Sequence, residues 1–145
     1  MVRLAFPITR VGLTLEALVG VDGSTMAALQ QAGQPITPPV HVRALIDTGT
    51  DITAVSAPVI RRLAIPQKVQ TFSQTASGLV RARLFNISFS VPDPLGIASP
   101  FVLPQLLVME LTAHLPDIDV LIGLDVVASW QLNIDGPARS FVVEY

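Results

Sequence analysis

The 145-residue chain is long enough to build one hydrophobic core and too short for two, so we expect a single domain over residues 1–145. Its net charge of −2, with nine basic residues, provides no positive field for phosphates and excludes phosphate-driven binding of nucleic acid. The absence of cysteine excludes a disulfide framework, thiol catalysis and cysteine-ligated zinc.

Half of the residues are apolar, and the mean hydropathy is +0.58. We expect no membrane span, because the longest uncharged run, Pro94–Met109, contains three prolines. The apolar start is interrupted by Pro7 and Arg10, so no secretory signal is visible and the cytoplasm is the default location. The excess of apolar surface predicts instead an interface between subunits, and hence an oligomer.

Alternating apolar residues, punctuated by Pro and Gly, predict a chain made mostly of strands. The first expected elements are a strand at Leu13–Val21, a helix within Ser24–Gly33 and a strand at Val40–Ile46. Ser24 is a candidate N-cap of this helix, and Gly33 is a candidate stop at its C-terminus. Residues 22–39 are therefore expected to form a surface insertion that carries one short helix.

A helical turn is expected at Ser56–Leu63, followed by a hairpin whose strands, Lys68–Ser73 and Leu79–Val91, join through Gln74–Gly78. Along the second strand, the apolar positions change parity between Leu84 and Phe85. Because parity decides which face of a strand a side chain occupies, this change predicts a bulge or a bend. The tip of the hairpin would then project from the body of the domain.

The remaining elements continue the β-rich pattern. Phe101–Leu111 contains Pro104, which favours an edge strand or two short pieces. A short buried strand is expected at Asp119–Gly123, a short helix at Asp125–Trp130, and a hairpin at Gln131–Tyr145 that turns at Asp135-Gly136. The predicted fold class is all-β, a compact barrel with one or two short helices.

The stretch A-L-I-D-T-G-T at Ala44–Thr50 places an acid, a hydroxyl residue and a glycine directly after a predicted strand. Asp and Gly at a strand end are also typical of a simple turn. The stretch, however, closely resembles the Asp-Thr/Ser-Gly active-site motif of aspartic proteases. A second stretch, V-L-I-G-L-D at Val120–Asp125, resembles the apolar-Gly motif and following helix of the retropepsin-like, or retroviral-type, members, and the hairpin between the two occupies the place of that family's flap.

This resemblance implies a retropepsin-like acid-protease barrel. The chain has one Asp-Thr-Gly motif, since Asp22-Gly23 and Asp135-Gly136 lack the intervening hydroxyl residue. The resemblance therefore implies a homodimer that brings together one Asp47 from each subunit. It implies an aspartic endopeptidase that cleaves extended polypeptides, prefers a hydrophobic cleavage site and uses no metal or organic cofactor. One Asp47 would act as general base on a water molecule while the other, protonated, polarises the scissile carbonyl.

The neighbouring residues acquire roles from the same resemblance. Thr48 would bond to the backbone of the other subunit, Gly49 would admit the substrate backbone, and Asp51 would bind the substrate main chain. Ala76, Ser77 and Gly78, at the flap tip, would close over the substrate. Ile122, Gly123 and Asp125 would form the structural motif, with Asp125 as a helix cap.

Three features depart from the retroviral pattern. Leu124 occupies a position where the family often has Arg or another polar residue, so Asp51 must find a different partner. The flap tip has a single glycine, Gly78, which predicts a stiffer or differently shaped lid. The segment before Val40 has no counterpart in the pattern, and is expected to shield a dimer edge or to occlude the cleft.

Other polar and aromatic residues have ordinary interpretations. His41 and His114 lack metal-ligand spacing and are expected at the surface, Arg81 and Arg83 on a solvated strand face, and Trp130 in the core or an interface. Two alternative functions remain open. The chain could be a catalytically silent peptide-binding or structural dimer module of the same fold, or a small β-barrel that carries apolar ligands.

Overall fold

The computed structural model describes residues 1–145, except for the side chain of Thr75. In chain order, its strands are β1 (Arg3–Pro7), β2 (Thr14–Val21), β3 (Val40–Ile46), β4 (Ala54–Ser56), β5 (Val69–Thr75), β6 (Gly78–Val91), β7 (Phe101–Leu111), β8 (Val120–Ile122), β9 (Gln131–Asp135) and β10 (Ser140–Glu144). The helices are α1 (Gly23–Gln31), α2 (Ala57–Leu63) and α3 (Leu124–Val127). The predicted all-β class is confirmed, with three short helices in the described chain rather than one or two.

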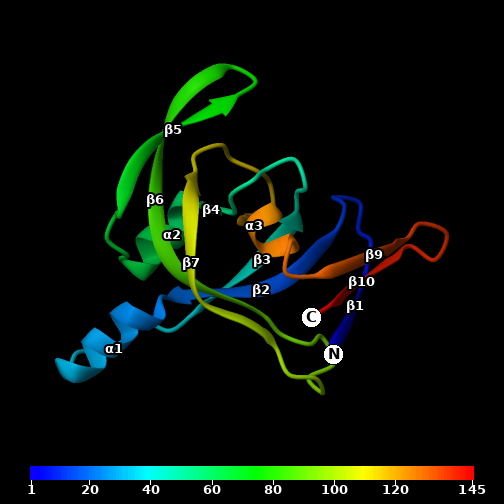
Figure 1. Ribbon diagram of the computed structural model, residues 1–145, viewed down its shortest axis with the longest axis horizontal. Helices are drawn as coiled ribbons and strands as arrows, with labels where there is room; N and C mark the ends of the chain where they lie inside the picture. Colours follow the sequence, from blue (N-terminus) through cyan, green and yellow to red (C-terminus); the bar gives the residue numbers. More distant parts are fainter.

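Six strands close into a barrel. They follow the order β2-β3-β8-β4-β7-β6, and a further antiparallel pairing between β2 and β6 completes the ring. Within the described residues, β5 pairs with β6 alone, so the β5–β6 hairpin extends beyond the barrel, as Figure 1 shows at the top of the molecule. We call this hairpin, residues 69–91, the flap hairpin.

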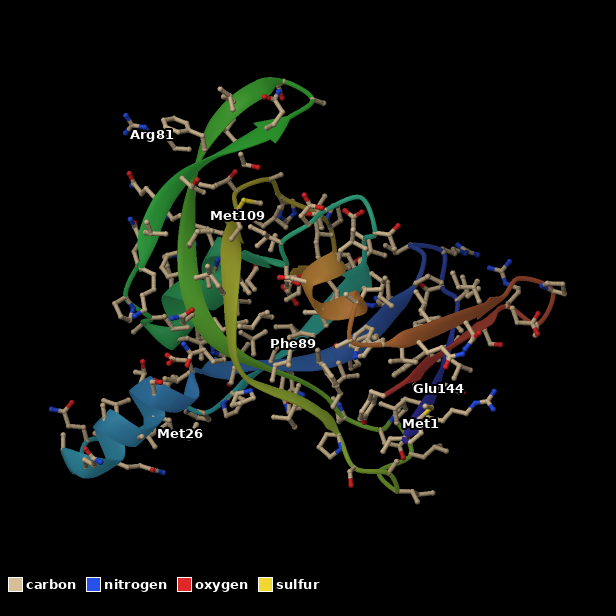
Figure 2. The ribbon with its side chains drawn as sticks, in the orientation of Figure 1. Met1, Met26, Arg81, Phe89, Met109 and Glu144 are labelled. Carbon is tan, nitrogen blue, oxygen red and sulfur yellow. The ribbon has the colours of Figure 1, made fainter. Side chains whose placement is uncertain are left out.

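The core lies inside the barrel, where alternate residues of each strand meet. Along β6, Phe85, Ile87, Phe89 and Val91 are buried and belong to one cluster with residues of β2, β3, β7 and β8. Figure 2 shows Phe89 near the centre of the molecule. Burial of each such side chain stabilises the fold by about 1.5–3 kcal/mol, so the barrel is a rigid support for the loops at its rim.

The predicted change of face in β6 is confirmed by the burial pattern, but the predicted bulge does not lie at this point. Leu84 and Phe85 are both buried although they point to opposite faces. The pairing runs through this point without interruption, because Leu84 lies opposite Val69 of β5 and Met109 of β7. A register shift does occur, but further along β6, between Ile87 and Phe89.

The expectation of an edge strand at Phe101–Leu111 is confirmed around Pro104, where the described chain gives the segment one neighbouring strand, whereas the alternative of two separate pieces was wrong. The segment forms the single strand β7, which pairs with β6 and, at its end, with β4. Pro104 has no assigned partner because it lies at the register shift between β6 and β7. Its missing N–H therefore interrupts no ladder hydrogen bond, and β4 pairs with β7 only from Met109 onward, which leaves Pro104 beside β6 alone.

The N-cap of helix α1 lies two residues before the predicted one. Asp22, not Ser24, is the N-cap, and its carboxylate accepts a hydrogen bond from the Thr25 N–H at 3.2 Å. Gly33 ends the helix as predicted, with φ +66°. None of the helix residues is buried, and Figure 1 shows α1 at the end of the molecule away from the flap hairpin, so it does not occlude a cleft beneath the flap.

The first strand, β1, was not predicted from the sequence. It pairs with β10, which pairs with β9, in a separate three-stranded sheet, and the hairpin predicted at Gln131–Tyr145 is confirmed. The chain ends lie side by side in Figure 1, where the Val2 N–H donates to the Tyr145 carbonyl at 2.8 Å. Among the described residues, no helix is both long and apolar enough to cross a bilayer.

Candidate active site

The Asp-Thr-Gly motif lies on a loop that crosses the end of β8. Strands β3 and β4 flank β8 on its two sides, parallel and antiparallel respectively, with Ile46 opposite Ile122. The intervening residues 47–53, which we call the acid loop, therefore pass over the apolar-Gly stretch at Ile122 and Gly123. The two motifs quoted from the sequence thus meet at one end of the barrel.

Asp47 is held at the start of the acid loop by its backbone. Its N–H donates to the Ile122 carbonyl at 2.9 Å, and its carbonyl accepts from the Thr50 N–H at 3.3 Å. One carboxylate oxygen, Oδ1, accepts from the Gly49 N–H at 3.0 Å. A Cβ on residue 49 would lie 3.2 Å from this oxygen, so glycine allows the close approach of backbone and carboxylate.

Gly123 packs directly under the acid loop. A Cβ at this position would lie 2.8 Å from the Ile52 carbonyl carbon and 3.0 Å from both the Thr50 oxygen and the Thr53 nitrogen. All three are backbone atoms, which cannot rotate away. The glycine of the second motif is therefore required by the space that the acid loop occupies.

Asp125 does not cap α3 as predicted, because Gly123 is the N-cap. Its carboxylate instead accepts two hydrogen bonds from Thr53, at 3.0 Å from the backbone N–H and 2.7 Å from the hydroxyl. The Thr53 hydroxyl is buried and accepts in turn from the Gly123 N–H at 3.0 Å. This chain of bonds ties the end of the acid loop to the start of α3.

The backbone strengthens the same connection. The Leu124 N–H donates to the Thr50 carbonyl at 2.9 Å, and the Asp125 N–H donates to the Asp51 carbonyl at 3.1 Å. The Met109 N–H of β7 donates to the Thr53 carbonyl at 2.9 Å. The acid loop is thus bonded to three neighbouring segments, which makes it a rigid platform for the Asp47 carboxylate.

A cavity of about 360 Å³ lies between the acid loop and the flap hairpin. Its lining includes Gly49, Thr50, Asp51 and Ile52 from the loop, Thr71, Phe72, Ser73 and Gln74 from β5, and Leu84 and Met109 from the barrel rim. Figure 2 shows Met109 below the flap hairpin. The cavity is the space that an extended chain could enter alongside β5.

The structure brings the predicted site residues together only in part. Asp47, Thr48, Gly49 and Asp51 share the acid loop, which rests on Ile122, Gly123 and Asp125. Ala76, Ser77 and Gly78 form the tip of the flap hairpin, where Gly78 adopts φ +117°, but none of them lines the cavity. Within one chain, the flap tip therefore does not contribute to this cavity.

Asp51 lines the cavity with an exposed side chain. In the described part of the chain, its carboxylate has neither a hydrogen bond nor an ion pair, so the expectation that it finds a replacement partner stays a prediction for the dimer. Leu124, on the adjoining helix, is 40% exposed and offers an aliphatic side chain instead of a charge.

Arg83 lies on an exposed strand face as predicted, but its guanidinium also forms an ion pair. Its guanidinium lies 2.6 Å from each carboxylate oxygen of Glu110, across the β6–β7 ladder. The Glu110 side chain is only 5% exposed, whereas that of Arg83 is 51% exposed. The ion pair therefore joins the base of the flap hairpin to the strand that supports the acid loop, while Arg81 points away from the body of the molecule in Figure 2.

The remaining singled-out residues lie where expected. His41 and His114 are exposed, and the described residues contain no group of three or more His, Asp or Glu side chains that could hold a metal ion. Trp130 belongs to the core, with its ring 5.2 Å from that of Phe101 in an edge-to-face contact. These residues add no chemistry to the site.

A comparison with protein families supports the interpretation of this geometry. A family model described as "Aspartyl protease" matches residues 33–126, which is more than half of the chain and includes both motifs and the flap hairpin. The chain belongs to the aspartyl protease family. Among curated proteins, the search found no match.

Solved structures of this class resemble the fold of this aspartyl protease family member. A retropepsin-like aspartic protease from Rickettsia conorii is 16% identical, with a TM-score of 0.64 over 99% of this chain and 91% of that chain. The retroviral protease-like domain of Ddi1 from Leishmania major is 17% identical, with a TM-score of 0.45 over 90% of this chain and 88% of that one. The first of these supports the predicted retropepsin-like barrel.

The sequence did not reveal every residue that shapes the site of this aspartyl protease family member. Thr53 and Asp125 form the central hydrogen bonds beneath the acid loop although 72 positions separate them. Leu84 and Met109 line the cavity from two adjacent strands. A single sequence contains no signal for such pairs, except that the change of parity at Leu84 indicated a residue facing away from the barrel interior.

Proposed function

We propose that this chain is an aspartic endopeptidase that hydrolyses peptide bonds in extended polypeptides. The main observation behind the proposal is the position of Asp47. It lies in the family's Asp-Thr-Gly motif on the rigid acid loop, and this loop adjoins a cavity under a β-hairpin. Asp47 is the proposed catalytic residue, and Gly49 orients its carboxylate.

The proposed enzyme is a homodimer, because one chain contains only one Asp-Thr-Gly motif and water activation in this family requires two carboxylates. Two observations support an interface next to the acid loop, and a third indicates a further exposed edge. Thr48 is exposed, and its hydroxyl has no partner among the described residues. Ile52 and Leu124 expose apolar side chains near it, and elsewhere on the surface β9 is an edge strand on which Ile134 is 58% exposed.

In the proposed mechanism, two Asp47 carboxylates meet on the two-fold axis and hold one proton between them, because like charges so close are costly to ionise together. The ionised Asp47 removes a proton from a water molecule, whose oxygen then attacks the scissile carbonyl carbon. The protonated Asp47 of the other subunit donates to the carbonyl oxygen. As the C–N bond breaks, the leaving nitrogen takes up a proton from the dyad, and a hydroxyl group of the tetrahedral intermediate returns one to it as the new carboxyl group forms. No covalent intermediate forms with the enzyme.

The flap hairpin and the cavity indicate how the proposed substrate would bind. An extended peptide beside β5 can form main-chain hydrogen bonds of the strand-addition type. Ile52, Leu84 and Met109 provide an apolar wall, which favours a hydrophobic residue near the cleavage site. Asp51 would bind the substrate main chain, and Ala76, Ser77 and Gly78 would close over it when a second subunit completes the cleft.

We further propose that residues 1–145 act as one domain, with residues 22–39 as a surface insertion. Helix α1 contributes no buried residue to the barrel. Its distance from the flap hairpin in Figure 1 argues for a role at the outer surface rather than at the cleft.

The direct test is cleavage of an unfolded protein mixture at mildly acidic and neutral pH, with Asp47→Asn beside the native chain. The proposal expects fragments from the native protein and none from the variant. Equal cleavage by both proteins would assign the activity to another catalyst and reject the proposal.

A silent peptide-binding dimer of the same fold is the second candidate. It is favoured by one observation, that neither Asp47 nor the flap tip lines the cavity of the single chain. This alternative expects a dimer that binds peptides but neither cleaves them nor binds a pepstatin-like inhibitor. Binding of the inhibitor to the native protein would exclude it.

A further inference from the structure

We propose that Asp51 makes the cleft selective for substrates that carry a basic residue, Lys or Arg, beside the hydrophobic cleavage site. This inference rests on the proposed function, because it assigns a substrate class to the same cleft. It also concerns binding, so it can be tested whether or not the chain cleaves what it binds.

The first observation is the free carboxylate. In the part of the chain that the structure describes, the Asp51 side chain forms no hydrogen bond and no ion pair, whereas its carbonyl is held by the Asp125 N–H at 3.1 Å. The backbone is thus anchored while the charge remains available. The Asp125 carboxylate differs, because it is already occupied by Thr53 and by the Val126 N–H.

The second observation is the composition of the cavity that Asp51 lines. None of its lining residues is Lys, Arg or His, and its other polar members, such as Thr71, Ser73 and Gln74, are neutral. The two arginines of the flap hairpin lie outside this lining, and Arg83 is engaged by Glu110. Within one chain, no cation of the protein lines this cavity, so a basic side chain of a ligand would meet the Asp51 carboxylate without a competing positive charge.

The third observation is the combination of an apolar wall with this acid. Ile52, Leu84 and Met109 line the same cavity as Asp51. Lys and Arg side chains suit such a site, because their methylene groups pack on aliphatic surface while the charged end reaches a carboxylate. A purely apolar side chain would leave the carboxylate without a counter-charge, and an acidic one would be repelled.

In the proposed dimer, the two-fold axis provides two Asp51 carboxylates for each bound peptide. An isologous dimer places one Asp51 on each side of the scissile bond. Peptides with a basic residue on both sides should therefore bind more tightly than peptides with one. Complementary charges at such positions also raise the association rate, and this contribution weakens as salt is added.

The test measures peptide binding to Asp47→Asn protein by fluorescence anisotropy, so that no probe is consumed. The probes share one hydrophobic core sequence and carry Lys, norleucine or Glu at each flanking position in turn. We expect the best Lys peptide to bind about five- to tenfold more tightly than its norleucine counterpart, and the Glu peptide more weakly than either. This ratio should shrink when salt rises from about 0.05 M to about 0.5 M.

Variants of Asp51 in the same background separate recognition from structure. Asp51→Asn should bring the Lys-to-norleucine ratio close to one, Asp51→Glu should retain it, and Asp51→Lys should make the Glu peptide the preferred probe. Asp117→Asn, at an exposed acid outside this cavity, is the matched control and should leave the ratio unchanged.

The two proposals fail in different ways. Equal binding of Lys and norleucine peptides at every position overturns the role of Asp51, even if the native enzyme cleaves both. A Lys preference that depends on Asp51 supports the inference, even if the native protein cleaves neither peptide and the proposed catalysis fails. Absence of binding by any peptide contradicts both.

Discussion

Gly123 shows how a single missing atom positions the candidate catalytic loop. The Cβ of an alanine would lie 2.8 Å from the Ile52 carbonyl carbon, so Gly123→Ala must displace the acid loop or α3. We expect a loss of about 1–3 kcal/mol in the free energy of unfolding, together with a loss of activity. Chemical denaturation measures the first, and cleavage of a peptide measures the second.

Gly136→Ala is the control for this substitution. A Cβ at Gly136 has no atom within 4 Å and φ is not positive, so stability should be unchanged or slightly increased. If both variants unfolded at the same denaturant concentration, close packing under the acid loop would not explain a requirement for glycine at position 123.

The buried hydroxyl of Thr53 is a second residue on which the acid loop depends. Thr53→Val keeps the shape of the side chain but removes the donor to Asp125 and the acceptor of the Gly123 N–H. We expect a loss of about 1–3 kcal/mol in stability, because buried polar groups are left without partners. Thr53→Ser retains the hydroxyl and should be clearly more stable than Thr53→Val in thermal denaturation; the reverse order would contradict this account.

At the scale of elements, the Arg83–Glu110 pair connects the flap hairpin to β7. Arg83→Ala leaves the Glu110 carboxylate buried without its cation, so we expect a loss of about 1–3 kcal/mol, moderated by the exposure of Arg83. Arg81→Ala changes the neighbouring cation on the same strand, for which the described chain shows no ion pair, and should have little effect. Calorimetry of both variants measures the two losses in the free energy of unfolding. Equal losses would show that the Arg83–Glu110 pair does not contribute specifically to stability.

The loop between β6 and β7 depends on another acid. Hydrogen bonds from the backbone N–H groups of Ala98, Leu95 and Ile97 hold the pKa of Asp93 below its ordinary value. A lowered pKa in the folded state means that the ionised form stabilises the fold above the unfolded pKa. This contribution is complete at neutral pH and disappears as pH falls through the lowered folded value.

We therefore predict that Asp93→Asn lowers the melting temperature at neutral pH. The difference in melting temperature between the variant and the native protein should become smaller as the pH falls below 3.8, the ordinary pKa of an aspartate. Asp51→Asn removes an exposed carboxylate that has no partner in the described chain. This substitution should leave the melting temperature unchanged, both at neutral pH and below pH 3.8. A constant difference for Asp93→Asn at all pH values would show that its charge is not involved.

At the scale of the whole molecule, local patterns predicted most strands because alternation and turn residues act over a few positions. The strand at Val40–Ile46, the hairpin that forms the flap and the C-terminal turn at Asp135-Gly136 were all predicted in this way. Strand β1 was missed because its five residues are held by pairing with β10, nearly 140 positions away.

The site was predictable to the same extent. Asp47 and its neighbours stand in a continuous motif that a sequence displays directly. The hydrogen bonds of Asp125 depend on Thr53, and the burial of Leu84 depends on the two strands beside β6. These features are determined by tertiary contacts, which local sequence propensity does not predict.

The central claim, that two chains each supply one Asp47, is tested most directly by mixing. A fixed amount of native protein is incubated with increasing amounts of Asp47→Asn protein, and cleavage of a hydrophobic peptide is measured. A shared dyad predicts that the variant inhibits, because mixed dimers hold one Asp47: at equal amounts, random pairing leaves about half of the native activity. Native activity that is unchanged at every ratio, with exchange of subunits demonstrated, would contradict the account.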